Sequence, residues 1–174
     1  MMRNLLLSVA AGLVLFVWGF VSWAVLPWHN MVAYKFTDEA AVSQVLKDNA
    51  PQPGVYYLPF SEQDHGPGQV GAFANVRPQG TEMNMGRQMG IGLVTQIVSA
   101  FLVLSLVSMT SGLVYWGKVG FFALVGLTIG FVSHAPYWNW FGFPAPYVGV
   151  TILDILVGWT LAGLVVVKFV RGRG

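Results

Sequence analysis

The sequence predicts an all-α membrane protein, a bundle of four transmembrane helices with a small α+β insertion between the first two. Hydrophobic residues make up 55% of the 174 residues and charged residues only 9%, whereas soluble domains carry about a quarter charged residues. Four apolar stretches each approach the ~20 residues that a helix needs to cross hydrocarbon. We therefore expect the whole chain, 1–174, to form a single integral membrane domain.

The four stretches differ in how directly they indicate membrane helices. The first, 5–26, is longer than the apolar core of a signal peptide, which has about 7 to 15 residues, so we expect it to stay in the protein as a helix. The other three expected helices are 88–109, 116–134 and 147–170. Four crossings place both ends of the chain on the same side of the membrane.

Lys and Arg residues predict the orientation of this bundle, because they favour the cytoplasmic side of a membrane. Most of them fall at the two ends of the chain or in the second connection: Arg3, Lys118, Lys168, Arg171 and Arg173. The third connection, 134–146, has no charged residue. We therefore expect cytoplasmic N and C termini and an extracytoplasmic segment 30–86.

The segment 30–86 has its own secondary-structure signals. Thr37 can cap a helix that ends near Asn49, and Pro51 stops it. Two β-prone runs follow, 55–60 and 69–76, separated by turn-forming residues. The sequence therefore predicts a helix followed by a β-hairpin, a unit too small to be stable alone.

Polar residues inside the apolar stretches are the candidate functional residues. Asp154 is the most informative, since an ionised carboxylate facing lipid at the centre of a membrane helix costs roughly 3 kcal/mol or more. Gln96 and Thr128 lie at a similar expected depth in the outer half of the bundle. Ser22 and His134 lie closer to the outer surface. We interpret these five residues as an intramembrane polar layer, in which Gln96 is expected to bond Asp154.

Two interpretations of Asp154 remain open from the sequence. In the first, its carboxyl group donates a hydrogen bond that fixes helix register. In the second, it titrates, binds a cation or transfers a proton, because intramembrane carboxylates often mark ion pathways.

Small residues follow the same helix faces as these polar groups, at a spacing of four residues. Such stripes let helices approach closely in a membrane. The expected packing residues are Gly92, Ala100, Gly126, Gly130, Gly158 and Ala162.

Several function classes are excluded or disfavoured. A formal charge of +2 is too small to suggest nucleic acid binding, and the absence of cysteine removes thiolate metal sites and disulfide exchange. The three histidines, His29, His65 and His134, lack the spacing of metal or haem ligands. No nucleophile elbow or phosphate-binding loop is present. We expect no catalytic residue, metal or cofactor.

Three segments carry a resemblance to known proteins: 25–30 (VLPWHN), 49–59 (NAPQPGVYYLP) and 137–143 (YWNWFGF). They resemble small four-helix proteins of the bacterial inner membrane that have no assigned function. The resemblance implies location in the inner (cytoplasmic) membrane of a bacterium and implies no activity.

Three functions follow as hypotheses. The first is a non-enzymatic assembly or accessory subunit, which acts through its insertion and glycine seams as a homo-oligomer or as part of a larger membrane complex in the lipid bilayer. The second is a small cation or proton transporter or channel that uses the layer of Gln96, Thr128 and Asp154. The third is a redox or metal-binding membrane subunit, which requires His29, His134 and Asp154 to converge.

Overall fold

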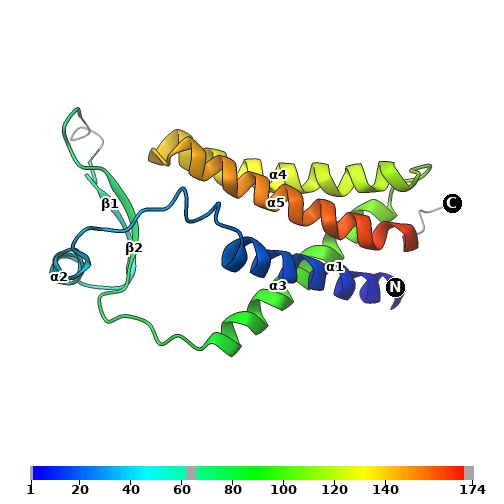
Figure 1. The fold of residues 1–174 in the computed structure, drawn as a ribbon, viewed down its shortest axis with the longest axis horizontal. Coiled ribbons are helices and arrows are strands. Elements are labelled where there is room, and N and C mark those ends of the chain that lie inside the picture. Colours follow the sequence, from blue (N-terminus) through cyan, green and yellow to red (C-terminus); the bar gives the residue numbers. More distant parts are fainter. Residues whose placement is uncertain (1, 62–65, 171–174) are drawn as a thin grey trace. The chain divides into compact units, whose positions relative to one another are not determined.

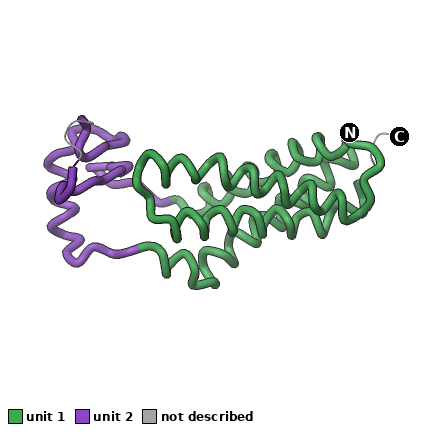
Figure 2. Tube along the Cα trace, turned by 90° about the horizontal axis from the view of Figure 1, so that it is seen from above, with its two compact units in different colours: residues 1–33, 84–174 green, residues 34–83 purple. Residues whose placement is uncertain are grey.

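The computed structural model describes residues 2–61 and 66–170, so the expected basic residues Arg171 and Arg173, and His65, lie outside the described residues. The chain forms two compact units. Unit 1 contains residues 1–33 and 84–174, and unit 2 contains residues 34–83 (Figure 2).

Unit 1 consists of four long helices (Figure 1). These are α1 (Met2–Phe20), continued by the π-helical turn η1 (Val21–Val25), then α3 (Met85–Ser108), α4 (Tyr115–Phe141), and α5 (Ala145–Val166), continued by the 3-10 turn η3 (Val167–Phe169). Within the described residues, four helices are long and apolar enough to cross a membrane, which confirms the four helices expected from the sequence.

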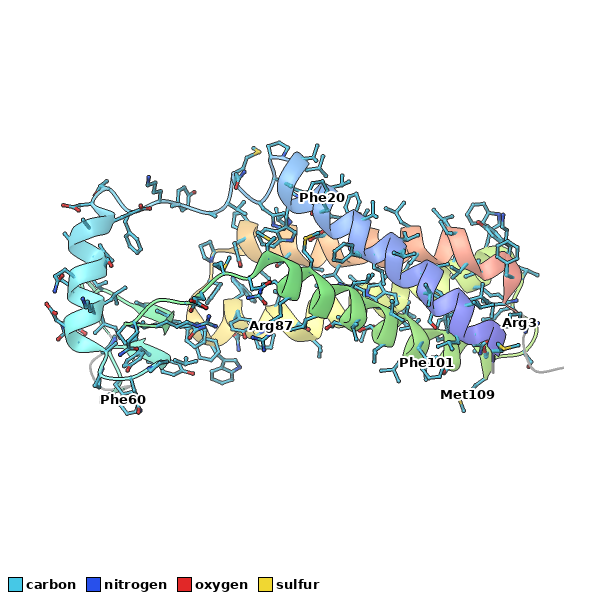
Figure 3. The ribbon with its side chains drawn as sticks, turned by 90° about the horizontal axis from the view of Figure 1, so that it is seen from below. Arg3, Phe20, Phe60, Arg87, Phe101 and Met109 are labelled. Atoms are coloured by element: carbon cyan, nitrogen blue, oxygen red, sulfur yellow. The ribbon has the colours of Figure 1, made fainter. Side chains whose placement is uncertain are left out.

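The four helices pack as two pairs. α1 packs along α3, α4 packs along α5, and contact between α1 and α5 joins the pairs, whereas α3 and α4 touch little. Figure 3 labels Arg3 and Phe20 at opposite ends of α1, with Arg87 of α3 towards the Phe20 end and Met109 towards the Arg3 end. α1 and α3 are therefore antiparallel, and Asn4 near the start of α1 donates to Ser108 at the end of α3 (3.2 Å).

Glycines set how closely α4 and α5 approach. A Cβ atom added at Gly126 would lie 2.7 Å from Cβ of Trp159, and one added at Gly163 would lie 2.8 Å from Cβ of Phe122. Both distances are shorter than real Cβ contacts, so no larger residue fits without movement. Similarly, a Cβ atom added at Gly130 would lie 3.1 Å from Cα of Ile152.

The expected packing residues differ in how closely they contact neighbouring helices. Gly126 and Gly130 are occupied by α5 of the same chain, so they are not free to join two copies. Ala100 and Ala162 are fully buried in the core. Gly92 is only half-buried, and a Cβ atom added there would lie 3.8 Å from Phe16 Cε2. A Cβ atom added at Gly12, which the sequence interpretation overlooked, would lie 2.6 Å from Ile97 Cγ1.

α4 extends seven residues beyond the expected end at His134. The segment after His134 contains a proline and several aromatic residues, which favour a loop in the sequence. The structure instead includes Pro136 within the helix, which ends at Gly142, a residue with φ of 67°. Glycine adopts this left-handed conformation without the steric penalty of a Cβ atom, so it provides the helix end.

Unit 2 contains the expected helix and hairpin. Helix α2 (Glu39–Asn49) begins after Asp38, whose carboxylate accepts from the N–H of Ala41 (2.9 Å), so Asp38 and not Thr37 caps it. Strands β1 (Gly54–Leu58) and β2 (Ala72–Val76) pair antiparallel, with Tyr56 opposite Ala74. Both strands are shorter than expected, and residues 62–65 of the expected turn lie outside the described residues.

Candidate functional site

One group of polar and aromatic side chains lies where the end of α1 meets α5. We call it the polar cluster, and it contains Trp18, Ser22, Trp28, His29 and Asp154. Ser22 and His29 are almost fully buried, with exposed fractions of 0% and 3%. Such burial of polar groups is tolerated only when they bond to one another, so their contacts carry information about function.

The end of α1 determines how Trp28 and His29 reach this position. The N–H of Leu26 bonds to the carbonyl of Val21 (3.0 Å), which is π-helical geometry, and Pro27 has no N–H to continue the pattern. The carbonyl of Ser22 therefore lacks a backbone donor. The indole N–H of Trp28 supplies one, at 3.1 Å from Ser22 O and 3.0 Å from Ser22 Oγ. Trp28 is thereby folded back against the helix that it follows.

His29 is brought to Asp154 by this reversal of the chain. Its Nε2 atom lies 3.1 Å from Ser22 Oγ and 3.3 Å from Asp154 Oδ2. The His29 side chain is 4% exposed and that of Asp154 is 13% exposed. Two groups that can each carry a proton are thus held together away from bulk water, with a hydroxyl beside them.

Trp18 fixes the other carboxylate oxygen of Asp154. Its Nε1 lies 2.7 Å from Asp154 Oδ1 and 3.1 Å from the backbone oxygen of Asp154. Gly158 makes room for this indole, because a Cβ atom there would lie 2.8 Å from Trp18 Cδ1. The small residue one turn from Asp154 is therefore needed for the position of Trp18.

This geometry allows the cluster to hold a proton. With one proton on Nε2, His29 is neutral and donates towards the Asp154 carboxylate, so the cluster carries one buried negative charge. A second proton on the imidazole would place its positive charge beside the carboxylate of Asp154. The indole of Trp23 lies stacked on the imidazole, with ring centroids 3.8 Å apart and planes at 9°. A stacked indole also favours a cationic ring.

Ser22, His29 and Asp154 are the residue types of a serine hydrolase triad, but their geometry differs from one. In a triad the carboxylate bonds one ring nitrogen and the serine hydroxyl bonds the other. Here both oxygens contact Nε2 of His29. The imidazole therefore cannot take a proton from the serine on one nitrogen while the carboxylate orients the other. The arrangement suits proton binding and does not support nucleophilic catalysis.

The remaining residues of the expected polar layer lie elsewhere. Gln96 lines a groove of about 720 Å³ between α1 and α3, together with Phe16 and Met89. Thr128 is exposed on α4 and donates to the carbonyl of Leu124 (2.8 Å). The Nδ1 atom of His134 lies 3.1 Å from the carbonyl of Gly130, in the preceding turn of the same helix. The oxygens of Asp154 are instead occupied by Trp18 and His29.

Sequence reasoning overlooked the two indoles of the cluster. Trp18 and Ser22 are four residues apart, which places them on one face of α1, as Asp154 and Gly158 are on α5. Two helix faces that each carry a polar residue could have indicated that Trp18 contacts Asp154. Nothing comparable existed for Trp28, because its position depends on the π-helical turn before it.

Within residues 2–61 and 66–170, no group of three or more His, Asp or Glu residues is placed to hold a metal ion. Comparison of the chain with models of known protein families, with curated proteins and with solved structures finds no match.

Proposed function

We propose that this chain is a non-enzymatic membrane protein that responds to acidity by binding a proton at the His29–Asp154 pair. The observation that supports this function is the position of a 4% exposed imidazole, 3.3 Å from a carboxylate on another helix. Histidine is the side chain whose charge generally changes between about pH 5 and 8. Because the pair joins the end of α1 to α5, a change in its charge alters the contact between the two helix pairs.

The packing of the bundle favours proton binding over conduction. Between the polar cluster and the opposite end of unit 1, apolar side chains fill the core, including Leu15, Leu104 and Phe122. Proton conduction requires a chain of water molecules or titratable groups through the protein. We therefore expect proteoliposomes that contain the protein to show no proton flux above that of empty liposomes.

The indole of Trp23 offers an optical test, because a protonated imidazole stacked on an indole quenches its fluorescence. The purified protein in lipid nanodiscs is titrated from about pH 4 to 9, which spans the histidine range. The signal of Trp23 is identified by comparison with Trp23→Phe. We expect fluorescence to fall as the pH is lowered through a single transition.

Three variants decide the result. His29→Gln should abolish the transition, and Asp154→Asn should change it, because the imidazole then loses the carboxylate that it contacts at 3.3 Å. Asp48→Asn, which removes an exposed carboxylate in α2, is the matched control and should change nothing. A transition that persists in His29→Gln would refute the proposal.

We further propose that the protein lies in the inner membrane of a bacterium, with unit 2 outside the cytoplasm. The basic residues Arg3, Lys118 and Lys168 support this orientation, since they lie in parts of unit 1 away from the polar cluster, near the starts of α1 and α4 and in η3. Lys118 donates from Nζ to the carbonyl of Val170 (2.6 Å), which shows that two of these segments meet.

The chain has no cysteine, so single cysteines can report this orientation. Ser43 is exposed in α2, and Ser111 is exposed between α3 and α4. In intact spheroplasts, a membrane-impermeant maleimide should label Ser43→Cys and leave Ser111→Cys unlabelled until the cells are broken. Labelling of both residues, or of Ser111→Cys alone, would contradict the orientation.

A second candidate function is assembly with a partner through unit 2. It is favoured by large apolar side chains that unit 2 exposes, including Tyr34 (90%), Phe60 (89%) and Val70 (74%). Large apolar side chains exposed at these fractions are available for contact with a partner. Phe60→Ser should then reduce the size of the complex seen after mild detergent extraction, while the pH transition of Trp23 is retained.

A further inference from the structure

The three indoles around His29 are held in different ways. Trp18 is fixed by Asp154 and Trp28 by Ser22, each through two contacts of its indole N–H. Trp23 stacks on the imidazole of His29, and among the described residues its N–H makes no hydrogen bond. Trp23 is also 57% exposed. It is therefore the indole that can leave its place without breaking a hydrogen bond.

The other ring nitrogen of His29 is unpartnered. Nδ1 is the one buried side-chain nitrogen or oxygen without a hydrogen-bond partner in the described part of the chain. When His29 carries two protons, Nδ1 becomes an N–H donor, and a buried donor without an acceptor is strongly disfavoured. Among the described residues, Asp154 is the charged or titratable group that contacts His29, and it is engaged at Nε2. Proton binding thus requires an acceptor at Nδ1 from outside the described residues.

We propose that this acceptor is a water molecule bound at Nδ1 of His29, and that Trp23 is the gate through which it enters. The inference rests on the proposed function. When Trp23 moves off the imidazole, water reaches Nδ1, and a hydronium ion of the acidic solvent passes its proton through this water to Nδ1, which leaves a neutral water molecule as the acceptor of the new N–H. The ring then becomes a cation, held by the carboxylate at Nε2 and by water at Nδ1. Return of Trp23 covers the site and adds its stacking to the charged state.

Water fits the site better than a larger ligand for two reasons. The imidazole is only 4% exposed, so a partner the size of one water molecule can be accommodated with the least movement. The ring is also covered by Trp23 on one face and contacted by Trp28, whose ring lies 5.7 Å away at 78°. A lipid or quinone carbonyl at Nδ1 is the alternative occupant, and the experiment below separates it from water.

Hydrogen exchange at the imidazole carbon between the two nitrogens measures solvent access and protonation of each histidine. The purified protein in nanodiscs is incubated in D₂O over a range of pH, and exchange at His29 is read by mass spectrometry of peptides. Trp23→Ala should accelerate exchange at His29 at least tenfold. Trp23→Phe should remain within twofold of the unsubstituted protein, because it keeps a stacked ring and loses only an unbonded N–H.

Controls exclude a general loss of structure. Trp138→Ala removes another exposed indole, on α4, and should leave exchange at His29 unchanged. His134 is the internal reference, since its rate should be the same in every variant. If Trp23→Ala does not fold, Trp23→Gln removes the stacked ring with less loss of volume and is expected to give the same acceleration. Equal rates in the folded variant and the unsubstituted protein, or equal acceleration in Trp23→Phe, would overturn the gate.

The same data distinguish the gate from the proposed function. If the pH profile of His29 is the same in the unsubstituted protein and in Asp154→Asn, the proposed function fails even where Trp23→Ala accelerates exchange. If the two profiles differ but Trp23→Ala has no effect, the gate alone fails. Adding a short-tailed quinone or lipid to the nanodiscs should not slow exchange at His29. Slower exchange would show that a carbonyl ligand, and not water, binds at Nδ1.

Discussion

Helix α5 makes two contacts of different character. Its face towards α4 is apolar and built from small residues, with Gly126 and Gly163 allowing close approach. Its face towards α1 carries Asp154, which bonds Trp18 and His29. Around Gly126 and Gly163 the first contact joins glycine to apolar side chains, whereas the second contains an imidazole and a carboxylate. Under the proposed function, one helix therefore combines a structural face with a face that responds to pH.

The largest effect is expected in the α4–α5 contact. Gly126→Leu places atoms where Trp159 Cβ and the carbonyl of Ile155 already lie, so it should lower the free energy of unfolding by about 3 kcal/mol. Gly120→Leu on the same helix is the control, because nothing lies within 4 Å of a Cβ atom there. Thermal unfolding in detergent measures both. Similar losses in the two variants would show that the close contact is unimportant.

Gly158→Ala should have a smaller effect on stability and a distinct effect on proton binding. Its Cβ atom displaces the Trp18 indole, at a cost of about 1 to 2 kcal/mol, and loosens the bond to Asp154. Because Trp18 holds the carboxylate that contacts His29, the pH transition should move. Gly149→Ala on the same helix meets nothing within 4 Å and should leave the transition in place. An unchanged transition in Gly158→Ala would separate Trp18 from proton binding.

Ser22→Ala tests the hydroxyl within the polar cluster. His29 keeps Asp154, and Trp28 keeps the backbone oxygen of Ser22, so we expect a loss of about 1 kcal/mol in the free energy of unfolding. Ser105→Ala is the control, because that hydroxyl bonds only the carbonyl of Phe101 in its own helix. Equal losses in the two variants would indicate that the hydroxyl of Ser22 has no special role.

Thr128→Val should have the smallest effect. The Thr128 side chain is exposed on α4 and its hydroxyl bonds the carbonyl of Leu124. We expect a change below about 0.5 kcal/mol, as for most surface substitutions, and no movement of the pH transition. A large shift of the pH transition would indicate that the proton binds at the layer of Gln96, Thr128 and Asp154 and not at the polar cluster.

The sequence predicted the helices better than the contacts between them. Apolar length predicted all four long helices, and small-residue spacing identified Gly126 and Gly158 as packing positions. Both signals are local to one helix. Which helix faces Asp154 depends on how each helix is rotated in the bundle, and equal depth alone does not determine it. Gln96 and Asp154 have similar expected depths, yet the partners of Asp154 are Trp18 and His29.

The ends of the helices were the least predictable parts. The sequence hypothesis that brings His29 to Asp154 also includes His134, whose ring contacts its own helix. The approach of His29 depends on the π-helical turn 21–25 and on Pro27, which together free a carbonyl for Trp28. The position of His29 therefore depends on hydrogen bonds of a few backbone groups in the folded protein. The spacing of apolar residues in the sequence does not predict such bonds.

The most direct test of the account is the protonation of His29 itself. Solid-state ¹⁵N NMR of protein labelled at histidine, in lipid bilayers, follows each ring nitrogen as the pH is lowered. We predict that Nε2 carries a proton throughout, that Nδ1 gains one in a single transition, and that Asp154→Asn changes that transition because it removes the carboxylate that contacts Nε2. A proton that stays on Nδ1 at every pH, or a transition unaffected by Asp154→Asn, would contradict the shared proton on which the account depends.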